Sequence, residues 1–194
     1  MATRNISAGS ASAYLAIPAS GSGPGLVLFN GTNALADLYA EDGYVTLNTT
    51  ASAADALSAL AGVSEIAGKI GAVGFAAGAR EAVQAAVDGK VACAISYYGS
   101  DLGGLTDVAG TNGVPVMFHL PDSDAEIFAK LRTRFPAIEV FFYRGVQAGF
   151  AVAGATYDRS SDNLAYTRTL ELLRRTLGPR YDLDKIWDRH TELE

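Results

Sequence analysis

The stretch 70–78 has the spacing of a motif that holds a catalytic nucleophile. It reads Ile-Gly-Ala-Val-Gly-Phe-Ala-Ala-Gly. In the pattern G-x-Nu-x-G a strand ends in a sharp turn, a helix follows, and the middle residue presents a reactive side chain. Gly74 and Gly78 occupy the two glycine positions, but Ala76 stands where Ser or Cys belongs. Because a methyl group cannot attack a carbonyl carbon, the motif predicts the backbone of a nucleophile elbow without its nucleophile.

An acidic residue stands where acyl-transfer enzymes of this type carry the acid of their triad, whose chain order is nucleophile, acid, His. Asp124 follows the predicted strand 114–120, at the edge of the sheet where ligands of open α/β folds bind. There it would orient an imidazole. The alternative is that Asp122, Ser123 or Asp124 caps the helix expected from Ala125.

The histidine of such a triad has no counterpart at its expected place. It should lie after the predicted strand 138–143, but the loop 144–150 contains none. The sequence has two histidines. His119 lies inside a predicted strand, which favours a hydrogen-bonded core residue over a general base, and His190 lies near the end of the chain.

Three further segments have a structural and a functional interpretation. The glycine-rich stretch 21–25 precedes a predicted strand and is interpreted as a turn, because a phosphate-binding loop would follow a strand. The stretch 30–33 does follow a strand, so its amides could bind an anion at a helix N-terminus, although capping by Asn33 is the simpler interpretation. Tyr97 and Tyr98 either line a pocket or cover the core.

Apolar runs alternate with helical patterns along the chain. The predicted strands are 14–18, 25–29, 44–47, 69–75, 91–97, 114–120 and 138–143. The predicted helices are 33–42, 51–67 with a break near Gly62, 77–87, 125–135 and 163–177. This alternation predicts βαβ units, which place helices on both faces of a mainly parallel sheet.

Composition narrows the class of protein. The chain has 194 residues, 49% of them hydrophobic, and a net charge of −6. That size and composition predict a globular chain, and the scattered 15 Lys and Arg residues argue against nucleic-acid binding. No apolar run is long enough to span a membrane, no signal peptide is recognisable, and a cytoplasmic location is expected. No metal-ligand spacing is found and no cofactor is expected. Cys93, the one cysteine, is expected to be a buried small hydrophobe.

A domain boundary is predicted at Gly178-Pro179. Residues 1–179 would form the α/β domain, and residues 180–194 an amphipathic tail helix with Trp187 on its apolar face. That face either docks on its own domain or forms an interface, such as that of a homodimer, because Trp is enriched at interfaces.

In the order and spacing of several short motifs, the chain resembles the dienelactone hydrolase (carboxymethylenebutenolidase) family over nearly its whole length. The motifs are Tyr14-Leu-Ala-Ile-Pro18, Gly23-Pro-Gly-Leu-Val27, Asp42-Gly-Tyr-Val45, Gly71-Ala-Val-Gly-Phe75, Tyr97-Tyr-Gly99, Val114-Pro-Val-Met-Phe-His119, Asp124, Tyr143 and Gly149-Phe-Ala151. The resemblance implies an α/β-hydrolase fold and a Cys–His–Asp triad that opens unsaturated lactones. On this chain the nucleophile position falls on Ala76, the acid on Asp124 and the His on Ala148, while Ala77 would supply one oxyanion-hole amide.

The chain departs from the family pattern elsewhere too. The segment 28–32 lacks the family's glutamate, and 151–153 lacks its substrate-binding arginine. The excursion between the strand at 44–47 and the elbow is also much shorter, which predicts a short or absent cap. We therefore expect a catalytically impaired homologue that binds an ester- or lactone-like ligand or a partner. The alternative is an active hydrolase that uses other groups, such as Asp124 with Tyr98 or His119.

Overall fold

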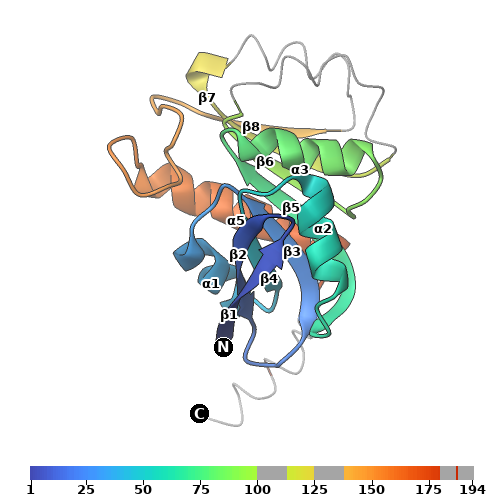
Figure 1. Ribbon diagram of the computed structural model, residues 1–194. Coiled ribbons are helices and arrows are strands. Elements are labelled where there is room, and N and C mark those ends of the chain that lie inside the picture. Colours follow the sequence, from blue (N-terminus) through green and yellow to red (C-terminus); the bar gives the residue numbers. More distant parts are fainter. Residues whose placement is uncertain (100–112, 125–137, 180–186, 188–194) are drawn as a thin grey trace.

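The computed structural model describes residues 1–99, 113–124, 138–179 and 187 (Figure 1). In this part of the chain the core is a sheet of 8 strands in the order β1-β2-β4-β3-β5-β6-β7-β8. The strands are β1 (Ala2–Ala8), β2 (Ala11–Ile17), β3 (Gly23–Phe29), β4 (Val45–Thr49), β5 (Ile66–Phe75), β6 (Ala94–Tyr97), β7 (Val116–Pro121) and β8 (Glu139–Tyr143). The neighbouring strands in the run β4-β3-β5-β6-β7-β8 pair in parallel. Strand β1 pairs with β2, and β2 with β4, in antiparallel orientation. The predicted mainly parallel sheet is thus confirmed.

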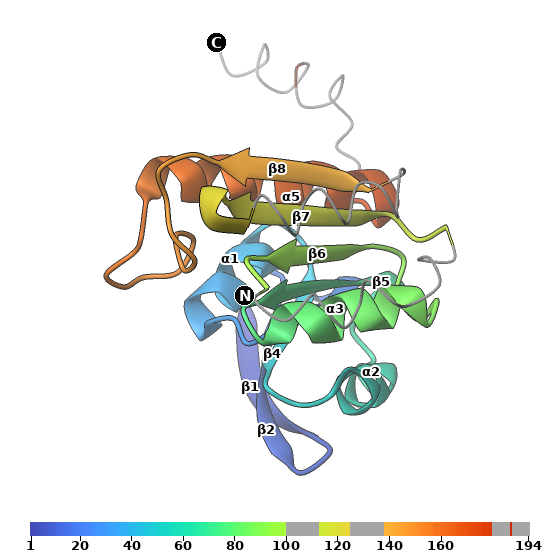
Figure 2. The ribbon, with the colours of Figure 1, turned by 90° about the horizontal axis from the view of Figure 1, so that it is seen from above.

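Helices cover both faces of this sheet (Figure 2). One face packs against α1 (Asn33–Glu41) and α5 (Arg159–Thr176). The other packs against α2 (Ala53–Ala61) and α3 (Gly78–Val87). The central strands are mostly apolar, as expected for strands buried on both sides. Their side chains form one core layer on each face of the sheet.

Two predictions about the first half of the chain are wrong. The helix predicted over 51–67 ends at Ala61, and Gly62, where a break was expected, is its C-cap. The part predicted beyond this break is wrong, because Ile66 begins β5 and pairs with Gly23. Strand β1 was not predicted at all. It is an edge strand whose side chains are mostly exposed, so it has no apolar face to give a strand pattern.

The start of α1 also differs from the prediction. The N-cap is Thr32, whose Oγ1 accepts a hydrogen bond of 3.1 Å from the Leu35 amide. Asn33 is the first helical residue, and its Oδ1 accepts a hydrogen bond from Asn48 instead. A threonine hydroxyl satisfies the free amides of a first turn nearly as well as an asparagine does.

Some predictions fall on residues outside the described ranges. These are the helix at 125–135 and, apart from Trp187, the tail at 180–194; the domain boundary therefore stays a prediction. Across the residues that the structure describes, none of the helices combines the length and hydropathy needed to cross a membrane.

Candidate functional site

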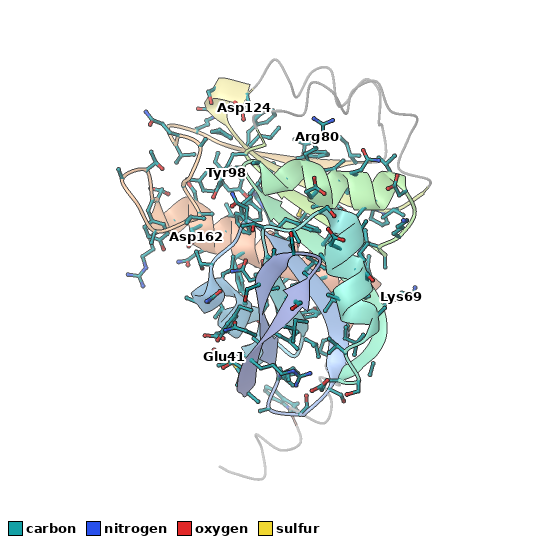
Figure 3. The ribbon with its side chains drawn as sticks, viewed as in Figure 1. Glu41, Lys69, Arg80, Tyr98, Asp124 and Asp162 are labelled. Carbon is teal, nitrogen blue, oxygen red and sulfur yellow. The ribbon has the colours of Figure 1, made fainter. Side chains whose placement is uncertain are left out.

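Parallel pairing brings the predicted site residues to one edge of the sheet. Phe75, Tyr97 and His119 are register partners across β5, β6 and β7, and Pro121 is paired with Tyr143 of β8. The segments that carry Ala76, Asp124 and Ala148 follow directly after β5, β7 and β8. All three positions therefore lie on the loops that leave the carboxyl ends of the strands, and Figure 3 shows Asp124 at that edge.

The backbone of the elbow is formed as the motif predicts. Ala76 has φ 48°, a left-handed conformation that costs a residue with a Cβ about 1–2 kcal/mol. A Cβ on Gly74 would overlap the carbonyl oxygen of Gly78, and one on Gly78 would overlap that of Phe29. The two glycines thus let β5, α3 and β3 approach closely. The Ala76 amide also donates a 3.1 Å hydrogen bond to the Tyr97 carbonyl, so the turn is fixed on both sides.

The elbow is accessible to solvent. Ala76 and Ala77 are both exposed, and Ala77 is the N-cap of α3 with no side-chain capping bond. Backbone amides in the first turn of a helix have no intrahelical acceptor, and the helix dipole favours negative charge there. Ala77 therefore lies at the exposed N-terminus of α3, next to Ala76, whose side chain is a methyl group.

The loops that carry Asp124 and Ala148 are joined by a hydrogen bond. Asp122 begins the short 3₁₀ helix η2 (Asp122–Asp124), and its Oδ2 accepts a 2.9 Å hydrogen bond from the Gly145 amide. Asp124 is half-buried and accepts a 3.1 Å hydrogen bond from the Ser123 hydroxyl. Ala148 is exposed. The acid is thus available at the edge, whereas the histidine position offers only a methyl group.

A cavity of about 270 Å³ opens beside the elbow. Its lining residues come from the ends of β3 and β4 and the first turn of α3; they are Phe29, Asn30, Thr49, Thr50, Ala51, Ala77, Gly78 and Glu81. Glu81 Oε2 accepts a 2.8 Å hydrogen bond from the Ala53 amide, which joins α3 to α2. Glu81 was not predicted from the sequence as a residue of this site. Its position four residues after Ala77 on a helix could have indicated it, because residues four apart lie on the same face.

His119 is a core residue, as predicted. It is fully buried; its Nδ1 lies 2.8 Å from the Tyr143 hydroxyl and its Nε2 lies 3.0 Å from Thr169 Oγ1. Burial, with a smaller contribution from the charge of Arg168, lowers the pKa of His119 to about 3. An imidazole that is neutral, hydrogen-bonded at both nitrogens and under α5 cannot act as a base at the elbow.

This buried network runs from Arg168 to Tyr97. Arg168 donates a 3.1 Å hydrogen bond to the Tyr143 oxygen, and that oxygen also pairs with His119 Nδ1. His119 Nε2 pairs with Thr169, whose hydroxyl lies 2.8 Å from that of Tyr97. Each polar atom finds a partner, which is what burial requires. The network joins β6, β7 and β8 to α5.

Two other sequence interpretations can be compared with the structure. Tyr97 and Tyr98 are 2% and 4% exposed, which fits the interpretation as a cover of the core. Cys93 is buried, and burial raises the pKa of its thiol to about 11, which fits a small hydrophobe. In the ranges described, no three His, Cys, Asp or Glu side chains gather as metal ligands would.

The mainly parallel sheet, its covering helices and the elbow backbone have the arrangement of the α/β-hydrolase fold. This architecture is shared by a dienelactone hydrolase-like promiscuous phosphotriesterase from metagenomic libraries (18% identity, TM-score 0.74, 91% of this chain and 98% of that one). It is also shared by a putative dienelactone hydrolase from Klebsiella pneumoniae subsp. pneumoniae (18% identity, TM-score 0.74, 88% of this chain and 97% of that one). A dienelactone hydrolase from Anabaena variabilis shares it too (15% identity, TM-score 0.64, 91% of this chain and 98% of that one). At these identities the likeness shows the fold alone.

The sequence itself gives the family. The profile of the dienelactone hydrolase family matches residues 42–177, which is most of the chain and spans the elbow, the acid loop and α5. The chain belongs to the dienelactone hydrolase family. Comparison with curated proteins gives no match.

Proposed function

We propose that this protein binds a small ester- or lactone-like molecule at the elbow and does not hydrolyse it through a covalent intermediate. The observation that carries the proposal is a formed, exposed elbow with a methyl group at its tip. Ala76 keeps φ 48°, and the neighbouring Ala77 amide and the 270 Å³ cavity offer a place for a carbonyl group. These features support binding at the elbow, and the methyl side chain of Ala76 argues against covalent attack from that position.

Energetics support the same conclusion. In triad hydrolases the loss of the nucleophile or the histidine removes several powers of ten in rate, and about 10³–10⁴ of acceleration remains from the oxyanion hole and binding. Here both the nucleophile position, Ala76, and the histidine position, Ala148, carry methyl groups. Attack by water without a general base is the channel left, and it is slow.

Restoring the missing groups tests the proposal. We expect Ala76→Cys with Ala148→His to hydrolyse dihydrocoumarin at least about tenfold faster than the original chain, because the elbow, the acid loop and the cavity are already in place. The single variants are the matched controls, since each supplies only half of the pair. Enzyme-like turnover by the original chain, or no gain in the double variant, would contradict the proposal.

Binding is measured separately from turnover. A saturated lactone, γ-butyrolactone, should give a saturable signal in ligand-observed NMR with the original chain. Ala76→Trp, which fills the exposed tip of the elbow, should abolish the signal. Ala19→Trp, at an exposed residue before β3 and thus at the opposite edge of the sheet, should leave it intact.

A second candidate, a hydrolase that uses non-standard groups, is favoured by one observation. Glu81 lines the same cavity as Ala77, so a carboxylate stands beside the oxyanion amide, and Asp124 lies at the same edge. His119 and Tyr98 do not suit this role, because both are buried. This candidate predicts lactone turnover by the original chain that Glu81→Gln or Asp124→Ala removes.

A further inference from the structure

A second cavity lies on the α1 and α5 face of the sheet, separate from the one beside Ala77. It has a volume of about 320 Å³ and lies between α1, the segment 151–153 and the first turns of α5. Much of its wall is apolar and comes from Leu35, Leu38 and Val152. Leu38 is 41% exposed, so this apolar wall reaches the surface.

One end of this cleft carries a negative charge. Asp162, in the first turn of α5, lines the cleft and is half-buried; Figure 3 labels it near α1 and the start of α5. Burial raises the pKa of Asp162, and the nearby Tyr157 hydroxyl offsets part of this rise. Of the described residues that line the cleft, none is a lysine or an arginine. The carboxylate therefore lacks a cationic partner within the cleft.

Two buried tyrosines lie near enough to Asp162 for its charge to raise their pKa values. Tyr39 is fully buried, and its hydroxyl has no hydrogen-bond partner among the described residues, whereas Tyr98, which is 4% exposed, has a hydrogen bond from the Ala151 backbone. Burial is the main cause that raises the pKa of each, and the charge of Asp162 adds to both. The backbone of Ala151, a lining residue, also affects the pKa of Tyr98. Buried polar groups without partners are uncommon in folded proteins.

We infer that this cleft binds a small organic ammonium compound with an apolar body. The ammonium group donates to the Asp162 carboxylate, which is its natural partner in a half-buried position, and the apolar part contacts Leu35, Leu38 and Val152. A carboxylate ligand would face Asp162 with the same charge. A neutral alcohol would bury the same apolar surface but leave the charge unpaired. The cleft shares no lining residue with the cavity beside Ala77, so the two proposals are tested by different variants and either can fail alone.

The test compares three probes with one apolar body: phenethylamine, 2-phenylethanol and 3-phenylpropionate. Binding is followed by methyl shifts of Leu35, Leu38 and Val152 in NMR titrations near neutral pH. We expect the amine to bind at least about tenfold more tightly than the alcohol, which corresponds to about 1.4 kcal/mol, and the propionate to give no saturable shift.

Two variants locate the effect. Asp162→Asn should weaken amine binding at least about tenfold and leave the alcohol unchanged, whereas Glu171→Gln, which removes a charge from an exposed position on the same helix, should change neither. Leu38→Arg places a cation at the mouth of the cleft and should abolish amine binding; because Leu38 is partly exposed, this variant keeps the test open if Asp162→Asn unfolds. Ala76→Trp should have no effect.

Equal affinity for amine and alcohol would overturn the inference. So would amine binding that survives Asp162→Asn in a folded protein, or that responds equally to Glu171→Gln, because the attraction would then be to the overall negative charge of the chain.

Discussion

Replacing Thr169 by valine should destabilise the protein strongly although the side chain keeps its shape. Thr169 Oγ1 lies 2.8 Å from the Tyr97 hydroxyl and 3.0 Å from His119 Nε2, and Thr169 and His119 are 0% exposed. Valine removes the oxygen and leaves both neighbours without this partner. Each unsatisfied buried group costs about 1–3 kcal/mol, so we expect the two groups together to cost about 2–6 kcal/mol. That is a large share of the roughly 5–15 kcal/mol typical of a domain.

Urea denaturation, followed by fluorescence and circular dichroism, measures this loss. The matched control is Thr167→Val on the same helix. Thr167 is exposed and its hydroxyl donates to the Asn163 carbonyl, so its replacement should change the free energy of unfolding by less than about 0.5 kcal/mol. Threonine and valine have similar helix propensities, so helix formation does not explain a difference. If the two variants lose equal stability, the buried network does not stabilise the fold as argued.

Two further predictions concern stability. Burial lowers the pKa of His119 in the folded protein from 6.5 to about 3, so as pH falls His119 is protonated first in the unfolded chain. Its contribution to the free energy of unfolding is therefore complete above about pH 6.5. That contribution is lost as pH falls toward 3, by at most about 1.4 kcal/mol per pH unit. Urea midpoints measured at decreasing pH should show this slope, and it should shrink in His119→Asn; an equal slope in that variant would contradict the assignment. Ala76→Gly should stabilise the protein by about 0.5–1 kcal/mol by relieving the left-handed backbone, whereas Ala54→Gly in the exposed face of α2 should destabilise it by a similar amount; thermal denaturation distinguishes the two signs.

The fold was predictable from sequence where the hydrophobic pattern of a segment matches the secondary structure that the segment forms. Runs such as Leu26–Phe29 are apolar because both sheet faces are covered, so they were recognised as central strands. Strand β1 is polar and exposed, and it forms by pairing with β2 in a hairpin. Its own side chains show no apolar alternation from which a strand could be predicted. The alanine-rich segment after Thr50 favours helix up to Gly62, which ends α2. The residues beyond it continue the helical pattern, but Ile66 pairs with β3 instead.

The candidate site was predictable to the extent that it depends on short motifs. Gly74 and Gly78 mark the elbow because only glycine tolerates the close approach of three elements. The partners of His119 could not be predicted, because Thr169 and Tyr143 come from elements far along the chain. Glu81 and Asp162 are ordinary helix residues in the sequence, and only the packing of neighbouring segments gives each a cavity.

The buried state of Cys93 has a practical consequence for work on this molecule. Its sulfur is enclosed under α5, where Thr176 contacts it, and its high pKa keeps it protonated, so maleimides and similar reagents will react with it slowly. A thiol introduced at the tip of the elbow would be the one readily alkylated site. The chain is therefore ready for selective attachment of a fluorophore or spin label at the place where an occupant of the elbow could be detected directly.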